Sequence, residues 1–140
     1  MTRVVIDPGV LIAAFISPHG APARLLARWA EGFFDLLVSP ALLDELERTL
    51  ARKKFRRYAT EAEAREYVES LWRRAVVVED PADVPAGLTP DPGDDYLVAL
   101  AREAEAHALV SGDPHLTGLE DARPRVLTPA ELLRLLESAG

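Results

Sequence analysis

Apolar residues follow two alternating patterns along the chain, short β-branched or aliphatic runs and longer stretches with helical spacing. The short runs have the length of buried strands. They lie at 4–6, 33–38, 75–78, 108–110 and 125–127. Strands that alternate with helices predict a parallel sheet with right-handed crossovers and helices on both faces. We therefore expect one α/β domain over residues 1–140, a three-layer α/β/α sandwich with a short parallel sheet of about five strands.

Helix starts are marked by hydroxyl residues and prolines ahead of the helical stretches. Ser39-Pro40 predicts a helix that runs through Leu50, with leucines along one face. Two more starts have the spacing of a capping box, in which a threonine and a glutamate three residues later bond each other's backbone N–H. These are Thr60 with Glu63 and Thr128 with Glu131. Residues 79–93, with four prolines, are expected to form a surface loop before a helix over 94–106.

Composition narrows the class of protein. Hydrophobic residues make up 49% of the chain and charged residues 28%, as in a globular domain. The formal charge of −7 argues against a protein that coats nucleic acid, although an enzyme can bind phosphates through metal ions and a local basic patch. The chain has no cysteine, and no run of about 18 apolar residues of the kind a membrane helix needs. With no export signal before the first strand, we expect a cytoplasmic protein without membrane contact.

Four acidic residues are expected at the carboxyl edge of the sheet. Asp7 and Asp113 follow the strands at 4–6 and 108–110, and Glu45 and Asp94 lie near the starts of two crossover helices. The carboxyl ends of parallel strands meet at one edge, where open α/β sheets bind ligands. Converging carboxylate oxygens there suit Mg²⁺ or Mn²⁺.

Structural roles would also explain most of these acids taken singly. Asp7 is a good helix N-cap, Glu45 has the position of a solvated helix charge, and Asp113 precedes a proline as turn residues do. Asp94 differs, because apolar side chains follow it at the three-, four- and seven-residue spacings of one helix face. Asp95, rotated by about 100°, is expected on the helix flank.

Four segments, in order, resemble the PIN-domain family, and most closely its branch of toxin components of prokaryotic toxin–antitoxin pairs. Each motif is weak alone, but the ordered set is specific and spans nearly the whole chain. The segments are Val-Val-Ile-Asp7, Ser39-Pro-Ala-Leu-Leu-Asp-Glu45, Asp91-Pro-Gly-Asp94-Asp95 and Val110-Ser-Gly-Asp113.

The resemblance implies a PIN-like fold and a Mg²⁺- or Mn²⁺-dependent endoribonuclease that hydrolyses phosphodiester bonds of single-stranded RNA. It also implies a homodimer or higher homo-oligomer and inhibition by a small antitoxin protein. The family's catalytic and metal-binding positions fall on Asp7, Glu45, Asp94 and Asp113, with Ser111 and Asp95 as supporting residues.

A basic segment follows the helix that carries Glu45. Its side chains are expected to contact the RNA backbone. Its five residues are Arg52, Lys53, Lys54, Arg56 and Arg57. A solvated helix end, favourable to the helix dipole, is an equally good explanation of the same charges.

Pro8 and Gly9 depart from the family pattern, in which a hydroxyl residue and then Asn or Ser follow the first aspartate. Pro8 has neither a hydroxyl nor a backbone N–H to support Asp7. The alternative function is therefore a catalytically impaired PIN-like binding module that acts through a protein or RNA partner. A phospho-receiver domain shares the architecture, but the chain lacks an acid pair near the first strand and a lysine late in the sequence.

Overall fold

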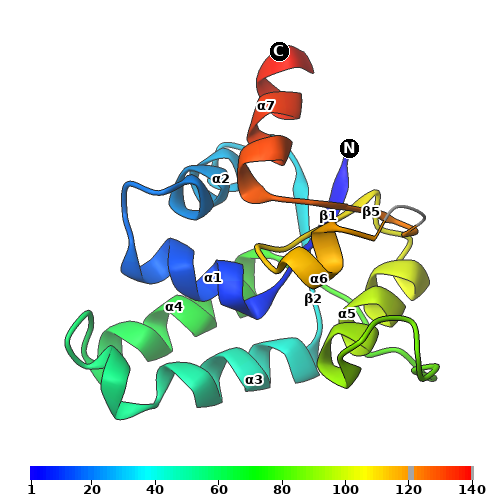
Figure 1. The fold of residues 1–140 in the computed structure, drawn as a ribbon. Coiled ribbons are helices and arrows are strands. Elements are labelled where there is room, and N and C mark those ends of the chain that lie inside the picture. The colour runs from blue at the N-terminus through cyan, green and yellow to red at the C-terminus, as the bar shows by residue number, and fades with distance from the viewer. Residues whose placement is uncertain (120–121, 140) are drawn as a thin grey trace.

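A five-stranded parallel sheet forms the centre of residues 1–119 and 122–139, the part of the chain that this computed structural model describes (Figure 1). The strand order is β3-β2-β1-β4-β5. The strands are β1 (Arg3–Ile6), β2 (Asp35–Val38), β3 (Val76–Val77), β4 (Ala108–Val110) and β5 (Arg125–Leu127). The predicted α/β class and parallel sheet are confirmed.

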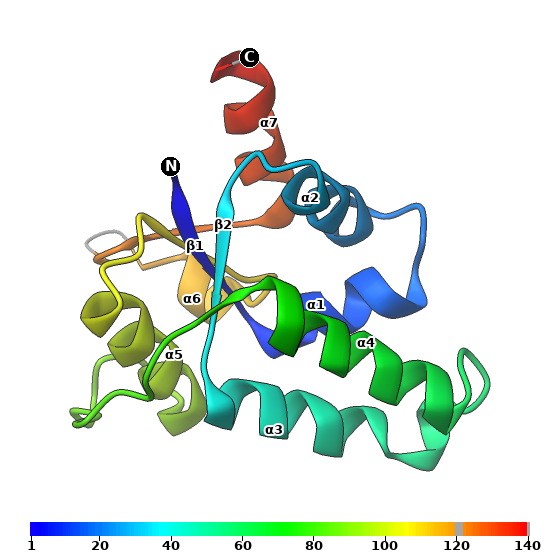
Figure 2. The same ribbon diagram turned by 180° about the vertical axis from the view of Figure 1, so that it is seen from behind.

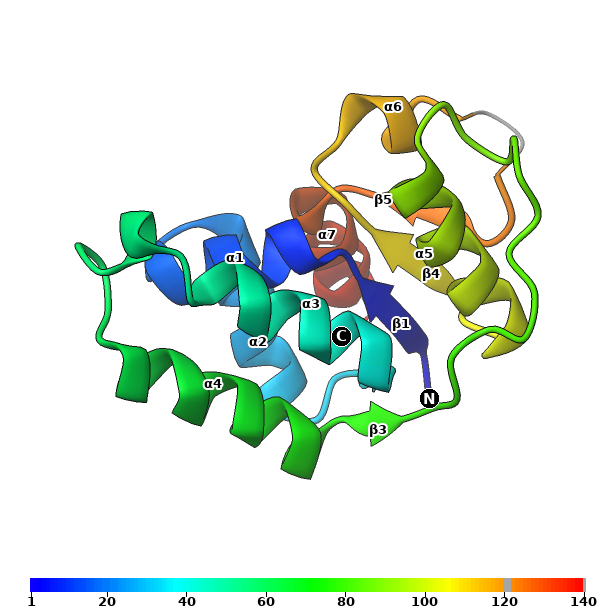
Figure 3. The ribbon, with the colours of Figure 1, turned by 90° about the horizontal axis from the view of Figure 1, so that it is seen from below.

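Helices cover both sides of the sheet, with α1 to α4 on one side and α5 and α6 on the other (Figure 3). Their bounds are α1 (Pro8–Ile16), α2 (Ala21–Ala30), α3 (Pro40–Leu50), α4 (Glu61–Arg74), α5 (Pro92–Glu103), α6 (Pro114–Thr117) and α7 (Pro129–Ala139), with a 3₁₀ turn η1 (Lys53–Phe55). Helices α3 and α4 pack side by side (Figure 2). Among the described residues no single helix has the length and hydropathy to span a membrane. Helices α1 and α2 meet these two criteria only when they are counted as one segment, and they lie at 95° to each other.

Strand β1 is the central strand, and its three apolar residues are fully buried. Val5 pairs with Leu37 of β2 on one side and with Leu109 of β4 on the other. A strand covered by helices on both faces needs apolar residues at every position, which explains the uninterrupted run Val4-Val5-Ile6. The central place of β1 puts Asp7 in the middle of the carboxyl edge.

The predicted helix starts are confirmed. Ser39 caps α3, and its hydroxyl accepts the Leu42 N–H at 3.2 Å. The Thr60–Glu63 capping box is complete, with both reciprocal hydrogen bonds formed. Thr128 and Glu131 bond each other's backbone N–H in the same way at the start of α7. Local sequence therefore determines where these three helices begin.

Helix α5 begins and ends earlier than expected. It begins at Pro92, because Asp91 is its N-cap and accepts the Gly93 N–H at 2.7 Å. It ends at Glu103, two residues before Glu105 adopts a left-handed conformation with φ 56° and the Ala106 N–H bonds back to the carbonyl of Ala101. Such a helix end usually carries glycine, so no residue type marks this end in advance.

Three other elements differ from expectation. Strand β2 begins at Asp35, two residues into the predicted run, because residues 31–34 form a turn. Strand β3 has two residues instead of four and lies at the edge of the sheet, where Val76 and Val77 are 41% and 44% exposed. Helix α6 is a single turn after β4, where the sequence predicts only that Asp113 is a turn residue. Its start at Pro114 makes Asp113 a helix cap.

The placement of Asp95 on the helix flank was wrong, because its side chain is buried and only 4% exposed. Its Oδ1 accepts the Thr89 N–H at 2.5 Å, and its Oδ2 accepts the Gly87 N–H at 3.2 Å. The loop before α5 folds back over this side of the helix and supplies both donors. Asp95 therefore holds that loop against α5.

We expect Asp95→Asn to destabilise the protein by about 1–3 kcal/mol, since an amide accepts with one oxygen only and leaves either the buried Thr89 N–H or the part-buried Gly87 N–H without its partner. Urea unfolding at neutral pH measures the change. The matched control is Asp44→Asn, which alters an exposed acid on α3 and should have no measurable effect. Equal unfolding midpoints for Asp95→Asn and wild type would contradict the loop-holding role.

Candidate active site

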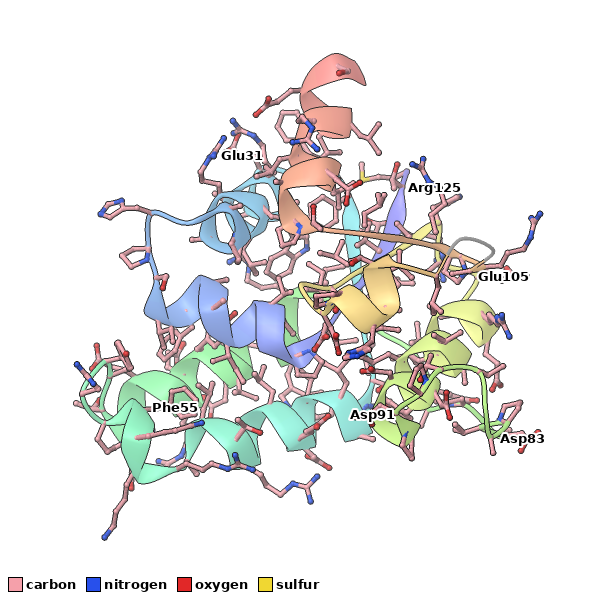
Figure 4. The ribbon with its side chains drawn as sticks, viewed as in Figure 1. Glu31, Phe55, Asp83, Asp91, Glu105 and Arg125 are labelled. Atoms are coloured by element: carbon pink, nitrogen blue, oxygen red, sulfur yellow. The ribbon has the colours of Figure 1, made fainter. Side chains whose placement is uncertain are left out.

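Three aspartates from distant parts of the chain gather at the carboxyl edge of the sheet. Asp7 follows β1, Asp113 follows β4, and Asp94 lies in the first turn of α5, which packs against both strands. The charges of Asp113, Asp91 and Asp7 all act on Asp94. Asp91 is the cap at the start of α5 (Figure 4). The site is therefore strongly acidic.

Asp7 is both a helix cap and a member of this acidic group. Its Oδ1 accepts the Gly9 N–H at 2.8 Å, and its Oδ2 accepts the hydroxyl proton of Ser111 at 2.9 Å. Ser111 is fully buried, and its oxygen also accepts the Asp113 N–H at 3.0 Å. The support that Pro8 cannot give thus comes from the next N–H along the chain and from the predicted hydroxyl residue.

Asp113 is held in its charged form by the start of α6. Its Oδ1 accepts the His115 N–H at 2.9 Å and lies 3.1 Å from the His115 Nδ1. The backbone hydrogen bond is the largest influence on this carboxyl; it outweighs desolvation and, with the imidazole, lowers the pKa of Asp113 below its ordinary value. Asp113 therefore carries a full negative charge at neutral pH.

Asp94 is the aspartate of this cluster whose charged form is least favourable. Burial raises the pKa of its carboxyl to about 6, and the neighbouring charges of Asp113, Asp91 and Asp7 act in the same direction. Its Oδ2 is buried, and among the described residues it has no hydrogen-bond partner. Buried carboxylate oxygens are rarely left without a donor or a cation. Asp94 is thus the acid most in need of a positive partner.

Without a bound cation, Asp94 should make stability depend on pH. Its folded-state pKa lies above the ordinary value of 3.8, so its contribution is complete below that value and is lost as the pH rises through about 6. We expect Asp94→Asn to remove this loss and, at neutral pH and without metal, to be as stable as wild type or more stable by on the order of 1 kcal/mol.

Thermal unfolding from about pH 4 to about pH 7 in EDTA tests the effect, with Asp44→Asn as the exposed control. The wild type should lose melting temperature over this range relative to Asp94→Asn. A destabilisation of Asp94→Asn by more than about 1 kcal/mol at neutral pH, the usual worth of a helix cap, would show that the charge of Asp94 stabilises the fold.

Glu45 is exposed on α3, and its charge acts on Tyr96, which follows Asp94 by two residues on α5. Burial raises the pKa of Tyr96 above its ordinary value, and its hydrogen bond to Asp80 adds to that effect. The structure therefore gathers Asp7, Asp94 and Asp113, and Glu45 lies on α3 with its charge acting on the start of α5.

A hydrogen-bonded network links the start of α3 to α5. The Tyr96 hydroxyl lies 2.6 Å from both Asp80 Oδ1 and Ser39 Oγ, and the two oxygens of Asp80 accept the Ala41 N–H at 3.2 and 3.3 Å. This network fixes the position of α3, which carries Glu45, relative to α5, which carries Asp94. Sequence reasoning missed Tyr96 and Asp80, although Asp80 follows the end of β3 by three residues, as Asp113 follows the end of β4.

Comparison with known proteins identifies the family. Residues 3–115 match the family described as PIN domain. The chain belongs to the PIN-domain family. PIN domains are generally nucleases, which act as hydrolases. The acidic edge described above is thus found in a fold whose members cut nucleic acids.

The individual proteins that this chain resembles have low sequence identity to it. Uncharacterized protein MJ1680 from Methanocaldococcus jannaschii is 26% identical over 144 residues, which cover 96% of this chain and 92% of the relative. The structure of VapBC2 from Rickettsia felis bound to a DNA fragment from its promoter matches 90% of this chain and 97% of its own, with TM-score 0.63 and 14% identity. PAE2754 from Pyrobaculum aerophilum matches 98% of this chain and 90% of its own, with TM-score 0.65 and 16% identity. At these identities the two structures establish a shared fold.

The donor set of this PIN domain suits a hard divalent cation. Within residues 1–119 and 122–139, no three acidic or histidine side chains already stand close enough to hold one ion. The chemistry of Asp7, Asp94 and Asp113 nevertheless fits Mg²⁺ or Mn²⁺, because both ions prefer carboxylate oxygens. The unpartnered Asp94 Oδ2 is an oxygen that such a cation would satisfy. Asp94 is therefore the residue whose buried oxygen would gain most from such a cation.

The predicted basic segment lies at the opposite end of α3 from the start of α5, as the labels Phe55 and Asp91 show in Figure 4. Four of its residues are exposed, namely Arg52, Lys53, Lys54 and Arg57. Arg56 instead turns inward and donates to the carbonyl of Leu50 at the end of α3, and its Nε and Nη1 are buried. Four side chains are thus available to a phosphate backbone, and Arg56 serves the helix end.

A groove with a volume of about 530 Å³ opens beside Asp7 and Asp113. Its walls come from α1, α2 and the start of α7, and most of them are small apolar residues. The sequence did not predict it, because the lining residues are spread from Asp7 to Ala130 and share no local pattern.

Proposed function

We propose that this chain is a Mg²⁺- or Mn²⁺-dependent endoribonuclease that hydrolyses phosphodiester bonds of single-stranded RNA. The observation that carries the proposal is the gathering of Asp7, Asp94 and Asp113 at the sheet edge, with a buried Asp94 oxygen that lacks a partner among the described residues. Membership of a family whose members are generally nucleases supports the same reaction class.

The residues of the chain hold the reacting groups in place. Asp94, Asp113 and Asp7 would be the metal ligands, and Ser111 fixes Asp7 and Asp113 relative to each other through its two hydrogen bonds. A bound divalent cation lowers the pKa of a coordinated water and offsets the charge that develops on the phosphate. Glu45 is the fourth proposed acid, on a helix whose distance from α5 is set by the Tyr96 network. No side chain has to act as a covalent nucleophile.

Cleavage of labelled single-stranded RNA should require added Mg²⁺ or Mn²⁺ and should stop in EDTA. Asp94→Asn should abolish cleavage and shrink the rise in melting temperature on adding Mn²⁺, because that rise reports binding to the folded state. Asp44→Asn should behave as wild type in both assays. Cleavage that persists in EDTA would overturn the metal mechanism.

A biological role as the toxin of a toxin–antitoxin pair is part of the proposal. The fold shared with VapBC2 from Rickettsia felis, crystallised on promoter DNA, supports a small antitoxin protein as partner. We further propose a cytoplasmic protein that forms a homodimer or higher homo-oligomer. A gene for a small DNA-binding protein directly upstream would agree with this role.

A second function is favoured by one observation. Because no three acids are already positioned for one ion in the described part of the chain, a PIN-like binding module without catalysis is the alternative. Absence of cleavage with every divalent metal, together with retained binding to RNA or a protein partner, would select it.

Variants in the basic segment can distinguish residues that contact RNA from a residue that stabilises the end of a helix. Replacing Arg52, Lys53, Lys54 and Arg57 by glutamine should weaken RNA binding and lower the slope of log affinity against log salt by about 0.7 for each phosphate that the variant no longer binds. Arg56→Gln is the matched control, and it should lower the unfolding midpoint without changing that slope. An unchanged slope in the fourfold variant would assign the segment to solvated surface.

A further inference from the structure

We infer that the groove between α1, α2 and α7 binds the nucleobase of a nucleotide next to the scissile phosphate. The inference rests on the proposed ribonuclease function and adds a specificity site to it. The groove is continuous with the acidic cluster, because Asp7 and Asp113 line both. A nucleotide whose phosphate lies at these carboxylates therefore has its base within reach of the groove.

The charges of the groove favour a neutral base over a phosphate. Among the residues that the structure describes, its only charged lining residues are Asp7 and Asp113, and no lysine, arginine or histidine lines it. A phosphate inside the groove would be repelled by the two carboxylates, whereas an uncharged base would not. The strand therefore has to place its backbone at the cation site and turn a base into the groove.

The shape and chemistry of the walls suit a flat apolar ring. Residues without long side chains line the groove from three directions, with Ala13 on α1, Ala21 on α2 and Ala130 on α7. Its volume of about 530 Å³ lies within the range of small-molecule sites. Thr128 lies at its border, and its oxygen accepts the Glu131 N–H at 3.1 Å. The hydroxyl proton can then be donated to a ring nitrogen or carbonyl oxygen of a base.

A larger side chain at Ala130 tests the assignment. Ala130 is exposed at the second position of α7, and Ala62 is exposed at the second position of α4, another helix that starts with a capping box. Ala130→Leu should reduce kcat/KM on single-stranded RNA roughly tenfold, which corresponds to about 1.4 kcal/mol of transition-state stabilisation. Ala62→Leu should not. Both variants should keep the rise in melting temperature on adding Mn²⁺.

Gly112→Leu adds a side chain at a second residue that lines the groove. A Cβ at Gly112 meets no described atom within 4 Å, so there is open space for the added side chain. It should reproduce the effect of Ala130→Leu. Wild-type activity of both variants on RNA would overturn the inference and leave a side chain of a protein partner as the occupant of the groove.

An RNA with one abasic ribose beside the cleaved bond gives a second readout. The wild type should lose activity on it, and Ala130→Leu should lose little more, because variant and substrate remove the same interaction. If the loss of activity from the abasic ribose and the loss from Ala130→Leu multiply, the base binds outside this groove. If the wild type cleaves no RNA with any metal, the proposed function fails. Binding of the intact and abasic strands to wild type and Ala130→Leu then decides on the groove alone.

Discussion

The unfavourable burial of Asp94 beside two other aspartates, Asp7 and Asp113, is the constraint on which the acidic edge of this PIN domain depends. The backbone holds them together regardless of charge, because β1 pairs with β4 and α5 packs on both strands. Hydrogen bonds from N–H groups and Ser111 stabilise the charges of Asp7 and Asp113. Asp94 receives no such donor at its buried oxygen from the described residues. The unfavourable energy is thus concentrated on Asp94, where the proposed cation would relieve it most.

Helix caps supply most of the acidic residues at this edge of the sheet. Asp7, Asp91 and Asp113 each precede a proline at the first position of a helix and accept the N–H two residues ahead. Such a bond occupies one carboxylate oxygen and fixes the direction of the other. The sequence left open whether Asp7 is a helix cap or a functional acid, and whether Asp113 is a turn residue or a functional acid. These structural and functional roles therefore do not exclude each other.

Elements with a strong local signal could be predicted from the sequence, and contacts made by the loop before α5 could not. β-Branched runs and hydroxyl caps located β1, β4, β5 and the starts of α3, α4 and α7. The burial of Asp95 and the link from Asp80 to Tyr96 depend on how residues 79–91 fold back, and no periodic pattern encodes that path. The buried position of the Arg56 side chain could not be predicted either, because its hydrogen-bond partner is a backbone carbonyl, which every residue type carries.

Parallel pairing of the first and fourth strands also sets an order of assembly. Asp7 and Ser111 are 104 residues apart, so the central strand completes its ladder only after most of the domain exists. Domains whose native contacts span such long sequence separations fold slowly. A chain still emerging from the ribosome carries the first acid without its partners. For a protein proposed to cut RNA, the topology itself keeps the site unformed while the translation machinery is nearest.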